Sequence, residues 1–199
     1  MRAAIVLNSK GHIINIEEEY IIAADAGYLE VLKQQKKPNV IIGDFDSSDM
    51  PNGFNIIKLN IEKDDTDGQA AIDYLKENSI DAVTIYGVGG GRMDHELCNL
   101  SLLAKAYKEG IDATAKEPDC DVFYREAGKV SFNIKKGATF SIIAFGDDLE
   151  ISNGVNTKYP IDNLYITKYE LGRSVSNIAL ADNVSFDILK GSALIFIYR

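Results

Sequence analysis

Carboxylates gather at four places in the first half of the sequence. They lie in Asp25-Ala26-Gly27, Gly43-Asp44-Phe45-Asp46-Ser47, Lys63-Asp64-Asp65-Thr66-Asp67 and Arg92-Met93-Asp94-His95. Oxygen ligands of this kind suit Mg²⁺, which usually takes one or two carboxylates together with substrate phosphates and water. The residue types and their grouping therefore favour a magnesium-nucleotide site over four independent turns.

Each acidic motif alone also has a plainer interpretation. Gly, Asp and Ser dominate ordinary polar turns, so Asp44 and Asp46 fit a turn as well as a metal site. Three acids within four residues, at 64, 65 and 67, repel one another unless a cation lies between them. Helix capping and compensation of the helix dipole explain one or two of these acids, and the motif alone leaves both interpretations open.

A glycine-rich loop, residues 87–91, precedes Arg92, Asp94 and His95. Glycines let the backbone approach a ligand, and the N-terminus of the following helix favours anions. A guanidinium grips phosphate oxygens, and a nearby acid can hold the metal that bridges them. The loop lacks the P-loop pattern, and Arg92 stands where a dinucleotide fingerprint has its third glycine. No second His or Cys accompanies His95 as a metal ligand. A histidine on the helix surface without a binding role therefore remains the alternative interpretation.

These motifs follow or precede elements that the apolar pattern predicts. Short β-branched runs predict strands at 3–7, 20–24, 40–42, 55–59 and 82–86, and helical spacing predicts helices at 27–35, 67–77 and 93–108. Strands that alternate with helices are typical of a parallel α/β sheet. Ligands bind at the carboxyl edge of such sheets, and all four acidic motifs are expected there.

The pattern changes after about residue 120. Strand-like segments lie at 122–124, 130–134, 139–145, 164–169, 184–189 and 193–198, separated by turns such as Gly128-Lys129 and Lys190-Gly191. Short strands at this spacing predict an antiparallel β-sandwich. We therefore expect an α/β domain with a mainly parallel sheet at 1–125 and an all-β sandwich domain at 126–199.

The charge follows the same division. The chain has 199 residues and a net charge of −9. Residues 1–125 hold 22 acidic and 13 basic residues, which gives −9, and residues 126–199 hold 8 of each, which gives 0. This balance disfavours nucleic acid and anionic membranes as partners, because both reward Lys and Arg. A small polyanion such as ATP is compatible with it, because a metal can complete the acidic site.

Compartment is inferred from two features. Cys98 and Cys120 are too few for a disulfide scaffold in a chain of this size and predict reduced thiols. No apolar stretch approaches the ~20 residues of a membrane span, and the N-terminal apolar run is too short for a signal peptide. The sequence therefore predicts a cytoplasmic protein.

Taken in order, the motifs are similar to those of the thiamine pyrophosphokinase family. The resemblance includes Gly-Asp-Phe-Asp-Ser, Gly-Gly-Arg-x-Asp-His with Asn99, and the late Ser174-Val175-Ser176-Asn177, and it covers nearly the whole chain. It implies an α/β domain followed by a β-sandwich, a homodimer with active sites between the subunits, and transfer of a pyrophosphoryl group from ATP to the hydroxyl of thiamine.

The resemblance also implies roles for individual residues. Magnesium binding and catalysis would fall to Asp44, Asp46, Asp67 and Asp94. Nucleotide binding would fall to Asp25, Gly27, Asp64, Gly90, Gly91, Arg92 and His95. Thiamine binding would fall to Tyr159, Ser176 and Asn177.

The sequence departs from the family in two respects. Ala26 stands where the family often has glycine, and the chain has no Trp, which some relatives use to stack thiamine. Tyr159 is the proposed substitute, because a cationic heterocycle stacks well on Tyr. A strand-end aromatic at Tyr159 and a plain turn at 174–177 remain the alternatives.

Three other functions stay open at this level. The same acids could activate water in a metal-dependent phosphohydrolase, or the chain could bind a nucleotide or thiamine without catalysis. A related pyrophosphokinase could act on another pyrimidine or pterin alcohol. These functions differ in the products that form when the protein is incubated with ATP, magnesium and thiamine.

Overall fold

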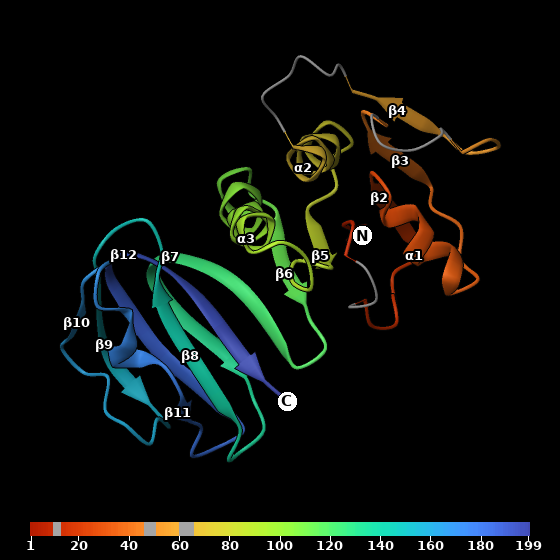
Figure 1. Cartoon of the computed structure of the whole chain (residues 1–199). Coiled ribbons are helices and arrows are strands. Elements are labelled where there is room, and N and C mark those ends of the chain that lie inside the picture. The colour runs from red at the N-terminus through yellow and green to blue at the C-terminus, as the bar shows by residue number, and fades with distance from the viewer. Residues whose placement is uncertain (10–12, 46–50, 60–65) are drawn as a thin grey trace. The chain divides into compact units, whose positions relative to one another are not determined.

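The computed structural model describes residues 1–9, 13–45, 51–59 and 66–199 (Figure 1). It divides into two compact units, Met1–Pro118 and Asp119–Arg199. The division falls before the expected boundary at residue 125, because the strand β7 (Cys120–Asn133) runs without a break through that position. None of the helices in the described ranges is long and apolar enough to span a membrane.

The first unit alternates strands and helices. It contains β1 (Arg2–Val6), β2 (Tyr20–Ala24), α1 (Gly27–Lys33), β3 (Val40–Gly43), β4 (Ile56–Lys58), α2 (Asp67–Glu77), β5 (Ala82–Tyr86), α3 (Met93–Lys108) and β6 (Asp112–Lys116). The predicted bounds of β2, α2, β5 and α3 are confirmed. The strand β6 was not predicted, because its only apolar residues are two alanines and it lacks the β-branched apolar run that marks the other strands.

The sheet of the first unit is parallel in every pairing, in the order β6-β5-β1-β2-β3-β4. The order runs outward in both directions from β1, which pairs with β2 on one side and β5 on the other. In open α/β sheets the crevice outside such a reversal point binds ligands. The chain segments that follow β1, β2 and β5 are therefore the expected walls of a binding site.

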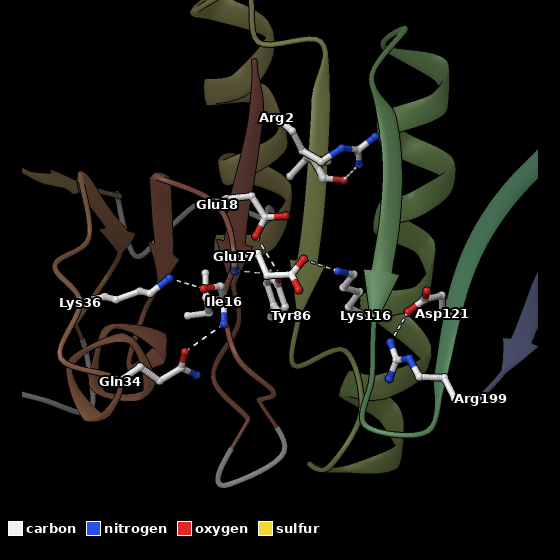
Figure 2. A network of polar contacts seen from close by, with 11 residues as sticks. Arg2, Ile16, Glu17, Glu18, Gln34, Lys36, Tyr86, Lys116, Asp121 and Arg199 are labelled. Atoms are coloured by element: carbon white, nitrogen blue, oxygen red, sulfur yellow. Dashed lines mark hydrogen bonds and ion pairs between the residues drawn. The ribbon is translucent and has the colours of Figure 1, made fainter.

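Tyr86, at the end of β5, is fully buried and anchors the segment that leads into β2 (Figure 2). Its hydroxyl donates to Glu18 Oε2 at 2.8 Å and accepts from the Glu17 amide at 3.4 Å. Burial, followed by the hydrogen bond to Glu18, raises the pKa of Tyr86, so the phenol stays protonated as a donor. Lys116 at the end of β6 pairs with Glu17 at 2.8 Å and closes the network.

The second unit consists of β-strands with one short 3₁₀ turn, η1 (Leu171–Ser174). After β7 come β8 (Thr139–Ala144), β9 (Leu149–Val155), β10 (Leu164–Ile166), β11 (Asn177–Ile178) and β12 (Asn183–Tyr198). Every recorded pairing in this unit is antiparallel, as the sequence predicts. The first half of β12 pairs with β9 and its second half with β8, while β7 follows it throughout. An apolar core with Phe132, Phe140 and Phe186 lies among these strands.

Two predicted turns in this unit are wrong. Gly128-Lys129 lies within the continuous strand β7, and Lys190-Gly191 lies within β12. These two strands pair with each other, and their register shifts between Ile188 and Ser192. A β-bulge absorbs the irregular residues there without ending either strand, which a search for turn residues alone misses. The strands β9 and β11 were not predicted either.

Candidate functional site

Asp25 and Gly43 lie side by side at the carboxyl ends of β2 and β3. The Asp25 amide donates to Ile42 O at 2.8 Å, and a Cβ built on Gly43 would lie 3.1 Å from Asp25 Cα. The lack of a side chain at Gly43 therefore lets the two strand ends approach. Gly27 does the same against β1, since a Cβ there would lie 2.2 Å from Val6 O.

One oxygen of the Asp25 carboxylate is not satisfied by the described part of the chain. Oδ1 is buried and has no hydrogen-bond partner among the residues that the structure describes, while Oδ2 accepts from Asn8 Nδ2 at 3.4 Å. The backbone of Asp25 has a φ of 46°, a left-handed conformation that is uncommon outside glycine. An unsatisfied buried acceptor together with such a backbone at a strand end marks a group held for a ligand.

Asp44 follows directly on the same edge and is half-buried. Phe45 has a φ of 55° and packs against the core that contains Val6 and Tyr86. Phe45 therefore anchors the residues that directly follow β3. Asp46 and Ser47 lie outside the described residues.

Thr66 caps α2, so the acids of this motif do not serve as the cap. Its Oγ1 accepts from the Gln69 amide at 3.3 Å, and its own amide donates to Gln69 Oε1 at 2.8 Å. Asp67 begins the helix, where its charge suits the helix dipole. Asp64 lies outside the described residues.

Arg92 and Asp94 bind each other at the start of α3. Arg92 Nε donates to Asp94 Oδ1 at 3.1 Å, and a terminal guanidinium nitrogen reaches Oδ2. The same Oδ1 also accepts from the His95 amide at 3.1 Å, and all three residues are exposed. The hydrogen bond from Arg92, aided by the His95 amide, holds the pKa of Asp94 below its usual range.

The glycine loop is held by side chains from three elements. Ser9, after β1, donates to Gly89 O, and Asn99 on α3 donates from Nδ2 to Val88 O at 3.2 Å. Glu117, after β6, accepts from the Val88 amide at 2.8 Å. Gly90 has a φ of 82°, which a residue with a side chain rarely adopts, whereas Gly91 donates to Glu96 Oε1 at 3.0 Å.

The carboxylates of the predicted metal set are chemically suited to Mg²⁺, which prefers hard oxygen ligands. Among the residues that the structure describes, no three Asp, Glu, His or Cys side chains come together as a metal site. Two acids of the site, Asp46 and Asp64, lie outside that part of the chain, and Asp94 is engaged with Arg92. A pocket between β3, β4 and α2, lined in part by Leu59 and Tyr74, contains none of the predicted site residues.

In the second unit, Asn177 holds the backbone of Tyr159. Its Oδ1 accepts from the amides of Tyr159 at 3.1 Å and Ile178 at 2.8 Å, and its Nδ2 donates to Tyr159 O at 2.8 Å. Asn177 is buried, whereas the Tyr159 side chain is 53% exposed and available for stacking. Lys158 Nζ lies 5.4 Å from the centre of the Tyr159 ring, and Ser176 donates from its amide to Ser141 Oγ at 3.0 Å.

Asn8, Ser9 and Glu117 were not predicted as residues of the site. All three follow strands of the parallel sheet at its carboxyl edge. Their position after a strand was the available signal for Asn8 and Ser9. Glu117 carried no such signal, because β6 itself was not predicted.

The family model, the curated relative and the solved structures given below all describe thiamine pyrophosphokinases. Residues 13–115 match the family model described as thiamin pyrophosphokinase, catalytic domain. A thiamine pyrophosphokinase of Bacillus subtilis (strain 168) is 29% identical over 180 residues, which cover 85% of this chain and 83% of the relative. A crystal structure of a thiamine pyrophosphokinase from Bacillus subtilis superposes with a TM-score of 0.86 at 24% identity and covers 100% of this chain and 99% of its own. A family protein from Enterococcus faecalis gives a TM-score of 0.85 at 21% identity, with coverage of 100% and 99%.

Proposed function

Because the chain belongs to the thiamin pyrophosphokinase family, whose catalytic-domain model matches residues 13–115, we propose that the carboxyl edge of its parallel sheet is the active site. The chain is a transferase that converts ATP and thiamine to AMP and thiamine diphosphate. The observation that carries the placement is the buried Oδ1 of Asp25, near the reversal point of the sheet, which has no hydrogen-bond partner within the described ranges. A donor on the substrate would satisfy this oxygen.

In the reaction, the hydroxyl oxygen of thiamine forms a bond to the β-phosphorus of ATP. The bond from that phosphorus to the oxygen bridging the α- and β-phosphates breaks, and AMP leaves with the bridging oxygen. The hydroxyl proton passes to a base, for which we propose Asp67. Positioning and charge stabilisation account for most of the catalysis in such transfers.

We assign nucleotide binding to residues around the reversal point of the sheet. Asp25, just after β2, and Gly27, at the start of α1, contact the nucleotide. The phosphates are bound from the glycine loop and the start of α3 by Gly90, Gly91, Arg92 and His95, together with Asp64. Arg92 has the planar donor fork that suits phosphate oxygens, and it is exposed at the start of α3. Its present partner, Asp94, shows that the fork is already oriented toward an anionic group.

We further propose that Asp44, Asp46, Asp67 and Asp94 hold Mg²⁺. When bound, the ion would neutralise phosphate charge and lower the barrier to attack by an oxygen nucleophile. The chemical suitability of the four carboxylates supports this proposal.

Thiamine recognition is assigned to the second unit, as part of a β-sandwich domain. The exposed ring of Tyr159 stacks the heterocycle, and Asn177 and Ser176 set the backbone that carries the ring or contact the substrate. We also propose a homodimer with the active site between subunits and a cytoplasmic location. The acidic net charge of −9 supports the absence of nucleic-acid and anionic membrane partners.

The decisive experiment is incubation of the full chain with ATP, magnesium and thiamine, with products identified by mass. Thiamine diphosphate and AMP in equal amounts, and no AMP without thiamine, are expected. Phosphate release that does not need thiamine would identify a phosphohydrolase instead. Tight binding by calorimetry with no product would identify a binding protein, and a panel of pyrimidine and pterin alcohols would show whether another acceptor is preferred.

A further inference from the structure

Glu117 places a carboxylate against the loop that the proposed function assigns to phosphate binding. Its Oε1 accepts from the Val88 amide at 2.8 Å, and its Oε2 would lie 3.2 Å from a Cβ built on Gly89. Both oxygens therefore lie against consecutive residues of the loop. A negative charge beside a phosphate site weakens the binding of anions. We therefore expect a role of Glu117 that offsets this repulsion.

Val88, whose amide donates to Glu117, is held by several further contacts. Val88 is buried, its carbonyl accepts from Asn99 at 3.2 Å, and the preceding Gly87 has a φ of 79°. Ser9 holds the next carbonyl, that of Gly89. A hydrogen bond from an amide to an ionised carboxylate is stronger than one between neutral groups, so Glu117 is the firmest of these restraints.

The backbone amides of the glycine loop differ in whether a side chain already occupies them. Glu117 occupies the Val88 amide, and Glu96 occupies that of Gly91. The amides of Gly89 and Gly90, between them, have no hydrogen-bond partner among the residues that the structure describes. Successive backbone amides in a glycine turn form a concave site for anions.

We propose that Glu117 is a positioning residue of the nucleotide site. It holds the Val88 amide and thereby directs the amides of Gly89 and Gly90 toward the phosphates of ATP. This inference rests on the proposed function for its ligand, while the contact between Glu117 and Val88 is tested independently of activity.

The test compares Glu117→Ala with Glu117→Gln. Alanine removes both the charge and the acceptor, whereas glutamine removes the charge but keeps a carbonyl acceptor at the same length. If Glu117 positions the loop, Glu117→Ala raises the KM for ATP about tenfold, the size of one lost hydrogen bond, and Glu117→Gln leaves it unchanged or lower. The KM for thiamine is expected to stay within twofold in both variants. If Glu117 acts only by repelling phosphates, both variants lower the KM for ATP, and the proposal is wrong.

A second measurement does not need turnover. Hydrogen exchange at the Val88 amide, followed by NMR, is expected to speed up in Glu117→Ala and to stay nearer the original rate in Glu117→Gln. The amide of Leu7, which donates to Tyr86 O at 2.9 Å, serves as the internal reference. Glu19→Gln, an exposed residue just before β2, is the matched control for loss of one negative charge.

These measurements test the proposed function and the positioning role of Glu117 separately. A chain that forms no thiamine diphosphate disproves the proposed function, while calorimetric titration with ATP and magnesium and the Val88 exchange rates still decide the role of Glu117. Normal activity with unchanged Val88 exchange and ATP affinity in Glu117→Ala disproves the positioning role alone. If Glu117→Ala does not fold, Glu117→Asp withdraws the carboxylate by one methylene and is expected to weaken ATP binding relative to Glu117→Gln.

Discussion

Arg92 and Asp94 form a two-point ion pair across the first turn of α3, with Nε 3.1 Å from Oδ1 and a second nitrogen on Oδ2. The two side chains assigned to phosphate and metal binding are thus each other's partners. The pair uses only some of the five guanidinium N–H donors, so a phosphate bound by Arg92 would either share the guanidinium with Asp94 or displace it. The pair therefore links the orientation of the guanidinium to the charge state of Asp94.

The first prediction is the pH at which Asp94 titrates. Its pKa lies below the usual value of 3.8, because Arg92 stabilises the ionised form. Asp94 therefore stays ionised from neutral pH down through pH 3.8, and any contribution of the pair to stability is lost only as the pH falls through the lowered value. In Arg92→Gln the pKa is expected to rise toward 3.8.

The measurement is a ¹³C NMR titration of the Asp94 carboxyl in both proteins. Arg173→Gln, which removes a guanidinium that donates to Tyr165 O in the second unit, is the control. Equal pKa values in the original chain and in Arg92→Gln would show that the ion pair does not persist in solution.

The second prediction separates binding from folding at Asp25. Asparagine tolerates the left-handed backbone, with φ of 46°, and replaces an unpartnered carboxylate oxygen with a neutral group. We expect Asp25→Asn to raise the KM for ATP at least tenfold while changing the free energy of unfolding by less than about 1 kcal/mol. Asp25→Ala should lose a further ~1 kcal/mol or more of stability, because alanine disfavours this backbone.

Initial rates and urea denaturation check both variants. An Asp25→Asn protein that loses stability but keeps its KM for ATP would show that the carboxylate serves the fold rather than the nucleotide.

The third prediction concerns why Gly27 is a glycine. An added Cβ would lie 2.2 Å from Val6 O, so β1 or α1 must shift. Gly27→Ala is expected to lower the free energy of unfolding by about 3 kcal/mol, as overpacking against backbone does. At Gly91 an added Cβ would meet no atom of the described residues beyond its chain neighbours within 4 Å, so Gly91→Ala should change the free energy of unfolding by less than about 0.5 kcal/mol. Similar thermal unfolding midpoints for these two variants would contradict the close approach of α1 to β1.

The parallel half of the fold was predictable because its signals are local. Apolar runs such as Ile21–Ala24, and the helical spacing of Leu100, Leu103 and Tyr107, depend only on neighbours in the chain. The long strands of the second unit were not predictable in the same way. Gly128 and Gly191 resemble turn residues. Gly128 pairs with Ile188 of β12, and Gly191 lies where the register between β7 and β12 shifts, so their place in strands depends on segments distant in sequence.

The site shows the same contrast. Acids such as Asp25 and Asp94 could be proposed as site residues because their motifs are contiguous. Glu117 was not, because its role depends on the lateral order of β5 and β6, which places it beside Val88. The intramolecular pairing of Arg92 with Asp94 and the bracing of Tyr159 by Asn177 also required atomic positions. Contiguous motifs thus suggest candidate ligand-binding groups, whereas contacts between residues distant in the sequence appear only in the folded chain.

The last prediction tests whether Tyr159 stacks thiamine. Tyr159→Ala is expected to raise the KM for thiamine about tenfold, through loss of aromatic and cation–π contact, and to leave the KM for ATP unchanged. Tyr159→Phe keeps the ring and should behave like the original chain. Tyr169 is a matched control, because it is also exposed and has Lys168 Nζ 5.6 Å from its ring centre, as Lys158 lies 5.4 Å from that of Tyr159.

Steady-state kinetics with each substrate varied in turn give kcat, the KM for thiamine and the KM for ATP of each variant. A rise in the KM for thiamine in both Tyr159→Ala and Tyr169→Ala would indicate a general surface effect. No rise in Tyr159→Ala would leave the exposed ring as a strand-end aromatic, because Asn177 would then brace a backbone segment that thiamine does not contact.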